Sequence, residues 1–587
     1  MARPLVYYAV SIFMGCFIFF ITINSPILGA VIAASFLAVM YFTTDKKFFY
    51  LIVCFFITSA INYYSYFNIN LPSAQRLKVR ISDKSNYYCY AKASNKKIIL
   101  EGNIFKLTEG RNVWISGNFK KIPVYERGIV GSYIVNDYKI CNEDLISRIE
   151  SFRRDLYEKF LVILGKEKTA LVMAVCFGDS GFIEKAQKED FKKLGISHVI
   201  SVSGLHMSIV YKALEIIIGY KVALLFSFTY MIFTGGQAST IRAFIMIFIL
   251  KISSKVYKKY DSLSSISLAA IILLLFRPFY ILDIGFMLSF LCVLGIILFN
   301  VKIKKVFYKL PATLNESFSL SISSQIFSLP YAVFALKTFS LGFLFSNLLL
   351  LPFYTVVVVL GNIGLVLSGF HWLLNLVNYG LYTVLTIIEF IQKILGIMLP
   401  GIIYVSYIES LVVFGLYLCY LGVKSGYIQF KYLPLCVIFV FAYQNYKVFP
   451  EISYINVNNN DIVLVQYRRD TIAVTTGNIN VGDLKVHVEA EKVLQGYQGD
   501  STMNLSGSSI IRLISHGNKL EAQVCFLENS NIKPNLEVFN DKLVFNSTGS
   551  EIVAYKNIIK LKKDETYVPT GTIINKYIII GNKILKF

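Results

Sequence analysis

The stretch ILDIGFMLSFLCVLGIILF, residues 281–299, decides the fold class, because it is almost entirely apolar and carries one charged residue, Asp283. About 20 consecutive apolar residues are enough for a helix to cross the hydrocarbon core of a bilayer. Similar stretches recur through most of the chain, and 55% of its 587 residues are apolar. The sequence therefore predicts a polytopic α-helical membrane protein.

Three apolar segments open the chain, at residues 5–23, 27–42 and 48–67. Charge in this part is confined to Arg3 and to the loop Asp45-Lys46-Lys47. Loops rich in lysine and arginine stay on the cytoplasmic side. We therefore expect three transmembrane helices in residues 1–67, a cytoplasmic N-terminus, and an extracytoplasmic position for the segment that follows.

Residues 71–143 have a different pattern, in which apolar and polar residues alternate between turn residues. This pattern predicts a small soluble β domain, a barrel. From Leu71 to Glu150 there are fourteen Lys or Arg against eight Asp or Glu, with aromatic residues between them. Such aromatics pack in a core or stack on the bases of a single nucleic-acid strand, and both interpretations stay open. The candidate DNA-binding residues are Lys78, Arg80, Lys96, Lys97, Arg111 and Trp114.

The remaining chain falls into three expected parts: an amphipathic, helical connector at residues 144–194, a polytopic channel core at 195–447, and a second β-rich soluble region at 448–587. Counting membrane crossings places both soluble regions outside the cytoplasm. Cys89 and Cys141 lie in the first of them, where two thiols can form a disulfide or stay free.

The formal net charge of the chain is +22, which is more than orientation signals require. One interpretation is contact with anionic lipid or with a polyanionic substrate. The other is that lysines flank the membrane helices of a protein whose composition is rich in Lys, Ile and Asn. The sequence leaves both open.

Ile196-Ser-His-Val-Ile-Ser-Val-Ser-Gly-Leu-His206 is the most polar segment at the start of the membrane core. Unpaired polar groups are costly in hydrocarbon, so we expect these side chains to face the protein interior or water. Glycine at position 204 allows close backbone approach. The residues expected to line a hydrated passage here are His198, Ser201, Ser203, Gly204, Leu205 and His206.

Three charged residues stand out further along the core. Between Asp155 and Val465 arginine occurs only at Arg242 and Arg277, in a chain that otherwise uses lysine. Arg242 can bind phosphate in a forked geometry or anchor its helix at the interface. Asp283 lies beside a long apolar stretch, and we expect it to pair with Arg242 or Arg277.

A hydrolase is a competing hypothesis. Ser203 and His206 stand three residues apart, and Asp179 or Asp283 could orient the imidazole. The flanking sequence does not form the G-x-S-x-G elbow, so we favour a polar passage over an activated nucleophile.

The run Val202-Ser203-Gly204-Leu205-His206 resembles the signature of the ComEC family of competence proteins, the inner-membrane channels for incoming transforming DNA. Thr234-Gly235-Gly236 followed by Arg242-Ala243 and Met246 looks like a second block of that family. A third block is similar to residues 277–290, which include Asp283, Gly285 and Ser289. Residues 325–330 and Ser346-Asn347 resemble its later membrane segments.

The resemblance covers roughly residues 1–446 and implies an OB-like N-terminal β domain, a channel for single-stranded DNA, and pore residues that include Gly235, Arg242, Asp283, Gly285 and Asn347. It also implies a periplasmic DNA receptor and leaves a homo-oligomer open. Because the chain has no P-loop, a cytosolic ATP-driven motor or helicase is expected to supply the force. A transporter or scaffold for another polyanion or envelope component is the alternative.

Many ComEC-type proteins end in a metallo-β-lactamase-like domain, and here the resemblance fails. After Tyr446 the chain has only His487 and His516, too few for a two-metal cluster. We therefore expect residues 448–587 to be a shortened, metal-free derivative or an unrelated β module. No enzyme activity, metal or cofactor is expected, and a separate nuclease would degrade the second strand.

Overall fold

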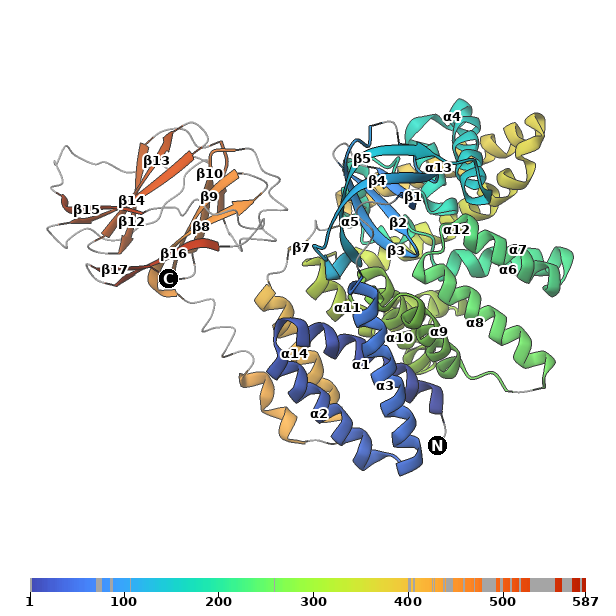
Figure 1. Cartoon of the computed structure of the whole chain (residues 1–587), viewed down its shortest axis with the longest axis horizontal. Coiled ribbons are helices and arrows are strands. Elements are labelled where there is room, and N and C mark those ends of the chain that lie inside the picture. The colour runs from blue at the N-terminus through green and yellow to red at the C-terminus, as the bar shows by residue number, and fades with distance from the viewer. Residues whose placement is uncertain are drawn as a thin grey trace. The chain divides into compact units, whose positions relative to one another are not determined.

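The computed structural model describes residues 3–69, 76–84, 88–105, 107–257, 259–340 and 342–399, and after these a set of shorter segments: 403–404, 407–424, 426, 428–436, 439, 447–457, 460–468, 470–477, 492–496, 500–506, 509–516, 519–527, 555–561, 573–580 and 583–586 (Figure 1). The chain divides into two compact units. The first is Met1–Leu329 with Ser340–Ile402, and the second is Pro330–Phe339 with Ile403–Phe587.

The first unit begins with three helices, α1 (Pro4–Asn24), α2 (Pro26–Thr43) and α3 (Lys46–Phe67). Small residues bring α1 and α3 together: a Cβ on Gly15 would lie 2.0 Å from Oγ of Ser59. Ser11 donates a hydrogen bond of 2.6 Å to the carbonyl of Ile52. Close contact between small residues is the usual way in which helices associate inside a membrane.

A closed barrel follows, with strand order β1-β2-β3-β5-β4. Its strands are β1 (Leu77–Lys84), β2 (Cys89–Ala93), β3 (Lys96–Gly102), β4 (Asn112–Lys120) and β5 (Ile129–Ile140). Alternate residues point inward, and Val79, Ile98, Leu100, Val113 and Tyr133 fill its interior. This five-stranded arrangement is OB-like, as the sequence predicted.

The helical core of the first unit is centred on α4 (Leu145–Phe177), which changes direction at Gly165, where φ is 74°. Residues 169–177 are buried on every side and pack with α12 (Phe343–Val366) and α13 (His371–Met398). The sequence predicted a polar helical connector here. The second half of α4 is instead the centre of the hydrophobic core.

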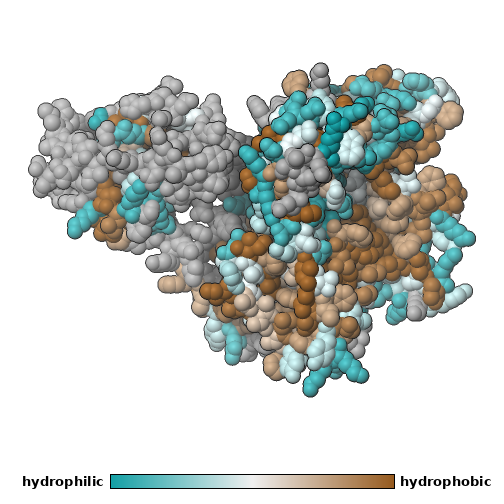
Figure 2. All heavy atoms as spheres, viewed as in Figure 1, coloured by the Kyte–Doolittle hydropathy of each residue, from teal (hydrophilic) through white to brown (hydrophobic). Residues whose placement is uncertain are grey.

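The other core elements are α5 (Lys185–Lys193), η2 (Ser197–Val199), α6 (Gly204–Ile218), α7 (Tyr220–Phe233), α8 (Ala238–Lys255), α9 (Ser262–Phe276), η3 (Pro278–Leu282), α10 (Ile284–Val306) and α11 (Ala312–Leu336). Within the described residues, seven helices are long and apolar enough to cross a membrane: α1, α2, α3, α10, α11, α12 and α13. Figure 2 shows a broad hydrophobic surface over the helices, whereas hydrophilic residues gather over the barrel and α4.

The second unit holds β6 (Thr338–Phe339), β7 (Ile403–Tyr404) and α14 (Tyr407–Lys424), followed by a mixed sheet, in which β10 and β11 are parallel, and an antiparallel sheet. One has the order β11-β10-β9-β8-β16-β17, and the other β12-β13-β14-β15. Their strands are β8 (Lys447–Val457), β9 (Asn460–Arg468), β10 (Asp470–Thr475), β11 (Lys492–Leu494), β12 (Asp500–Ser506), β13 (Ser509–His516), β14 (Lys519–Leu527), β15 (Tyr555–Leu561), β16 (Ile573–Ile580) and β17 (Lys583–Lys586).

Both sheets contribute to one core, in which Ile452 and Val465 meet Ile511 and Val524. The sheets therefore form a sandwich. The predicted class, a polytopic α-helical membrane protein with two β-rich domains, is confirmed.

Candidate nucleic-acid interface and membrane motif

The outer face of the barrel carries a first row of cations across three neighbouring strands. Arg80 of β1 lies opposite Lys92 of β2, which in turn lies opposite Lys97 of β3. Like charges placed directly opposite one another destabilise a sheet. Such a row is therefore suited to a bound anion, which would relieve the repulsion.

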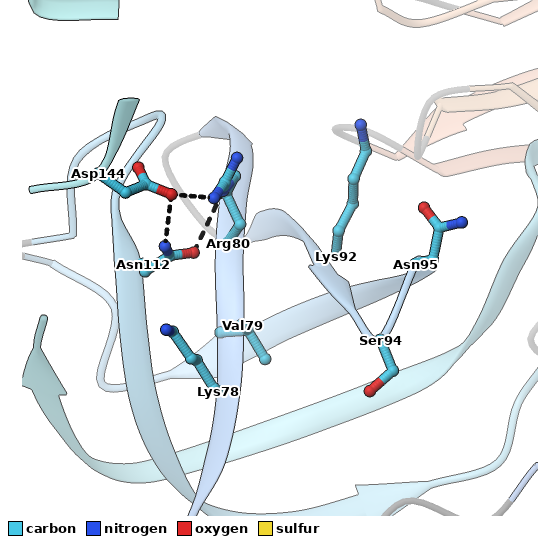
Figure 3. A pocket seen from close by; sticks show the side chains of 8 residues that line it. All are labelled: Lys78, Val79, Arg80, Lys92, Ser94, Asn95, Asn112 and Asp144. Carbon is cyan, nitrogen blue, oxygen red and sulfur yellow. Dashed lines mark hydrogen bonds and ion pairs between the residues drawn. The ribbon is translucent and has the colours of Figure 1, made fainter. Parts of the chain in front are cut away.

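A recess of about 510 Å³ opens on this face (Figure 3). It is lined by Lys78, Val79, Arg80, Lys92, Ser94, Asn95, Asn112 and Asp144. Lys92 stands apart from the polar network in the recess and has no anionic partner among the described residues. Burial, together with the nearby charges of Arg277, Lys97 and Arg80, lowers the pKa of Lys92 to about 8.

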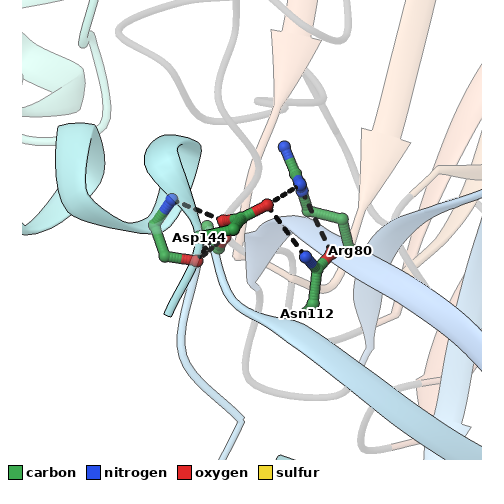
Figure 4. A network of polar contacts seen from close by, with 5 residues as sticks. Arg80, Asn112 and Asp144 are labelled. Carbon is green, nitrogen blue, oxygen red and sulfur yellow. Dashed lines mark hydrogen bonds and ion pairs between the residues drawn. The ribbon is translucent and has the colours of Figure 1, made fainter. Parts of the chain in front are cut away.

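Arg80, by contrast, is already neutralised (Figure 4). It forms an ion pair with Asp144 and donates from Nε to Oδ1 of Asn112 at 3.2 Å. Asp144 also caps α4, because its Oδ1 accepts from the backbone N of Ser147 at 2.9 Å. Burial would raise the pKa of Asp144, but the hydrogen bonds from Ser147 and the charge of Arg80 hold it below its usual value. This network fastens the barrel to the first turn of α4.

A second row lies two residues along the strands and contains the exposed aromatic ring of Trp114. Trp114 of β4 lies opposite Lys78 of β1 on one side and Lys139 of β5 on the other. Both lysines are exposed, and the indole is 40% exposed. An indole between two ammonium groups can stack on a base while the lysines contact the flanking phosphates.

Three other predicted DNA-binding residues have different contacts. Lys96 donates to the carbonyl of Ser65 at 2.8 Å, next to the end of α3. Lys97 ends the first row but lies with Nζ 5.0 Å from the centre of the Phe279 ring in η3. Arg111 forms an ion pair with Glu143 at 3.3 Å. Lys96 and Lys97 thus hold the barrel against the helices.

Sequence reasoning missed Lys92 and Lys139. A signal for Lys92 was present, because β2 alternates between buried Cys89, Ala91 and Ala93 and the residues between them. That period of two places Lys92 on the outer face. Only the strand pairing shows that it lies opposite Arg80.

The polar motif before α6 forms a capping box. Oγ of Ser203 accepts from the backbone N of Leu205 at 3.2 Å, and Nδ1 of His206 accepts from the backbone N of Ser203 at 3.0 Å. His206 is only 3% exposed. The two side chains thus stabilise the start of the helix and are not arranged as a nucleophile and its base. The exposed side of the motif includes His198, Ser201 and Leu205.

The glycine of the motif contacts Arg242 of α8. A Cβ added to Gly204 would lie 2.8 Å from Nη2 of that arginine. Oγ of Ser239, also in α8, donates to the carbonyl of Val202 at 2.8 Å. The start of α8 is therefore fixed to the segment that leads into α6, and two motifs from separate parts of the sequence meet.

Asp283 does not form the expected ion pair with Arg242 or Arg277 among the described residues. It caps α10, with Oδ1 accepting from the backbone N of Phe286 at 2.7 Å. Arg277 instead donates to the hydroxyl of Tyr280 and to the carbonyl of Gly236. A helix cap satisfies a carboxylate without a cation, which is why the predicted pairing was wrong.

The remaining motif residues lie at several places in the core. Gly235 adopts φ of 82° in the turn between α7 and α8, a conformation that favours glycine. Gly285 lies in the first turn of α10, and Ser289 is half-buried one turn later. Asn347 of α12 is 8% exposed, and its Oδ1 has no partner among the described residues.

Cys89 is buried in β2, and Cys141 follows β5; both are free thiols in the structure. In the described part of the chain no group of three or more His, Cys, Asp or Glu could hold a metal ion. His516 ends β13, and His487 lies outside the described residues.

These features define a class: a polytopic membrane protein whose helical core carries an OB-like barrel with basic and aromatic residues on its outer face. Residues 175–428 match the family model described as Competence protein. The chain is also 28% identical over 255 residues to ComE operon protein 3 of Bacillus subtilis (strain 168), a match that covers 42% of this chain and 32% of that protein. No solved structure matches the chain. The predicted resemblance to the ComEC family of competence proteins is confirmed over this matched part of the chain.

The chain matches about a third of the length of that relative. The matched region begins in the buried half of α4, includes the Ser203 capping box and Arg242, and ends beyond α14.

Proposed function

We propose that this protein is an inner-membrane channel that takes up single-stranded DNA during natural transformation. The observation that supports this most is the row Lys78–Trp114–Lys139 beside the row Arg80–Lys92–Lys97 on the barrel. The competence family of the helical core supports the same role. Both soluble domains would lie outside the cytoplasm.

In this proposal the barrel holds the strand before it enters the helices. Lys78, Lys139 and Lys92 contact phosphates, and Trp114 stacks on a base. Arg80, paired with Asp144, positions the recess and contributes less charge. Three lysine contacts predict that log K falls with log[salt] with a slope of about −2, since each single-strand phosphate contributes about −0.7.

The strand would then pass the exposed side of the motif, which includes His198, Ser201 and Leu205. Hydroxyl, imidazole and backbone groups suit a sliding phosphate chain because they can exchange hydrogen bonds with it and with water. A periplasmic receptor would deliver the DNA, a cytosolic ATP-driven motor would pull the strand, and a separate nuclease would degrade its complement.

Binding of a fluorescent oligothymidylate to the full chain in nanodiscs tests the barrel. The double variant Lys78→Gln/Lys139→Gln is expected to weaken binding at least tenfold, because a hydrogen bond between charged groups contributes about 1.5–3 kcal/mol. The matched control, Lys185→Gln/Lys192→Gln, removes two exposed lysines of α5 and is expected to bind as the unchanged protein does. Equal loss in both would mean that the binding is nonspecific.

DNA uptake in a deletion strain tests passage itself. Supplying the chain should restore uptake, and the Lys78→Gln/Lys139→Gln variant should restore much less. If the unchanged chain binds DNA but restores no uptake, the channel role is refuted.

A transporter or scaffold for another polyanion is the second candidate. The exposed indole of Trp114 favours nucleobases over polyphosphate, because a polyphosphate offers no ring for stacking. The test is competition between polyphosphate and oligothymidylate for the unchanged protein and for Trp114→Ala. Equal competition in both proteins would support this second candidate.

A further inference from the structure

Arg242 is a buried arginine without a carboxylate partner among the described residues. It lies in the second turn of α8 and is 5% exposed. Its guanidinium carbon is 5.8 Å from the centre of the Phe290 ring, and Cys292 of the same helix, α10, is near enough to interact with its charge. Its Nε has no hydrogen-bond partner in the described part of the chain.

A second buried arginine, Arg153, shows how hydrogen bonds and an ion pair can compensate a buried guanidinium. Arg153 of α4 is 7% exposed, but Nη1 forms an ion pair with Glu150 at 3.0 Å and Nη2 donates to the carbonyl of Phe177. A buried charge without compensation is strongly destabilising. Nε is unpaired in both arginines among the described residues, but Arg242 lacks the ion pair and the carbonyl contact that Arg153 makes.

The first turn of α6 lies against the same guanidinium. Gly204 is its first residue, and a Cβ atom there would lie 2.8 Å from Nη2 of Arg242. The helix is 15 residues long, so its first turn carries the positive end of its dipole. The Ser203 cap accepts the backbone N–H of Leu205, whereas the N–H of Gly204 has no hydrogen-bond partner among the described residues. A fixed cation beside a helix N-terminus is electrostatically unfavourable, because both are positive. An anion that contacts both relieves this repulsion.

We infer that Arg242 and the first turn of α6 form a binding site for one phosphodiester group of the passing strand. The inference rests on the proposed function and assigns a subsite within it. The guanidinium supplies a forked pair of donors, and the backbone N–H of Gly204, which the Ser203 cap leaves free, supplies one more. Glycine at position 204 lets the guanidinium lie against the first turn of the helix, so that one anion can contact both.

The surroundings make the site both fixed and reachable. The hydrogen bond from Ser239 to the carbonyl of Val202 holds α8 and the start of α6 in register. Ser203 and Gly204 are partly exposed, and Leu205 is 43% exposed. A strand that passes the motif can therefore reach the first turn of α6, against which the guanidinium lies.

The test uses the full chain in nanodiscs of neutral phosphatidylcholine. Its background carries Lys78→Gln, Lys92→Gln, Lys139→Gln and Trp114→Ala, so that the barrel no longer dominates binding. The probe is oligothymidylate, compared with the same oligomer carrying uncharged methylphosphonate linkages. The residual binding is expected to need the charged backbone. Arg242→Gln should weaken it about tenfold, as expected for the loss of a charged hydrogen bond.

Two further variants guard against loss of folding. Arg242→Lys keeps the charge but not the fork, and should retain part of the binding. Gly204→Ala fills the space beside Nη2 and should weaken binding, whereas Gly396→Ala, a helix glycine with open space around its Cβ, should not. Thermal unfolding of each variant shows whether it is folded.

Residual binding that is unchanged in folded Arg242→Gln would overturn the inference. The inference would also be overturned if adding phosphatidylglycerol to the nanodiscs abolished oligothymidylate binding by the protein that keeps Arg242 and Gly204. The site would then belong to a lipid headgroup. If the protein restores no DNA uptake but its binding of oligothymidylate still depends on Arg242, the channel role is refuted and the anion site is retained.

Discussion

The guanidinium of Arg242 lies directly beside the backbone of Gly204, where a Cβ atom would be 2.8 Å from Nη2. Gly204→Ala is therefore expected to displace the guanidinium, which is the flexible end of its side chain, and to destabilise the folded protein by about 1 kcal/mol, the low end of the cost of overpacking. Thermal unfolding of the full chain in nanodiscs measures this, with Gly396→Ala as the control. Identical melting of the two variants would show that the contact is loose.

Substitutions at Ser203 separate a helix cap from a nucleophile. Asparagine is a good N-cap residue but has no hydroxyl group, so Ser203→Asn should keep both stability and DNA uptake. Ser203→Ala should cost about 1 kcal/mol of stability, because the acceptor for the backbone N of Leu205 is lost. Thermal unfolding and uptake assays check both. A complete loss of function in a stable Ser203→Asn protein would revive the hydrolase hypothesis.

Asp144 has two roles that two substitutions can distinguish. Asp144→Ala should lose about 1 kcal/mol, because both the cap of α4 and the partner of Arg80 disappear. Asp144→Asn keeps an oxygen for the cap and should lose less. Because the pKa of Asp144 is held low, its contribution is present at neutral pH and is lost as the pH falls through that lowered value. Acid titration of unfolding should therefore show a smaller pH dependence in both variants.

Trp114 is expected to contribute affinity by stacking rather than by charge. Trp114→Ala should weaken binding of oligothymidylate by about 1–3 kcal/mol, the value for one stacked base. Trp114→Phe keeps an aromatic ring and should retain most of the binding affinity. The salt dependence should be the same in all three proteins, because no phosphate contact is removed. A reduced salt slope in Trp114→Ala would contradict stacking.

Lys92 should make DNA binding depend on pH near neutrality. Its pKa is lowered to about 8 by burial and by neighbouring cations, so the ammonium form is present below that pH and is lost as the pH rises through it. Binding of oligothymidylate should therefore weaken between about pH 7 and pH 9. Arginine stays charged over this range, so Lys92→Arg should flatten the profile. A steep profile that persists in Lys92→Arg would place the titrating group elsewhere.

Lys92 is also expected to lower the free energy of unfolding of the protein. Unfolding restores the normal affinity of Lys92 for a proton, so the unfolded state binds more protons than the folded state between pH 8 and the ordinary lysine value of 10.5. The free energy of unfolding attributable to this group therefore rises with pH across that window. Lys92→Gln is expected to melt at a higher temperature than the unchanged protein at pH 7 while binding the strand less tightly.

Much of the fold could be predicted because it depends on local pattern. Runs such as residues 281–299 are long and apolar, and hydrocarbon admits them only as helices. The alternation of buried and exposed residues around Val79 and Ile81 predicted strands. The buried half of α4 was missed, because residues 169–177 lie beside charged residues and do not reach the length of a membrane span.

The sequence by itself determined the membrane class, the positions of the β-rich regions and the residues of the family motifs, since hydropathy, periodicity and motif spacing are properties of neighbouring residues. Only the tertiary structure decided which of the motif residues meet. It placed Gly204 against Arg242, made Asp283 a helix cap, and aligned Lys92 with Arg80 and Lys78 with Trp114. These relations depend on strand register and on the packing of helices far apart in the chain, where a shift of one residue turns a side chain to the opposite face.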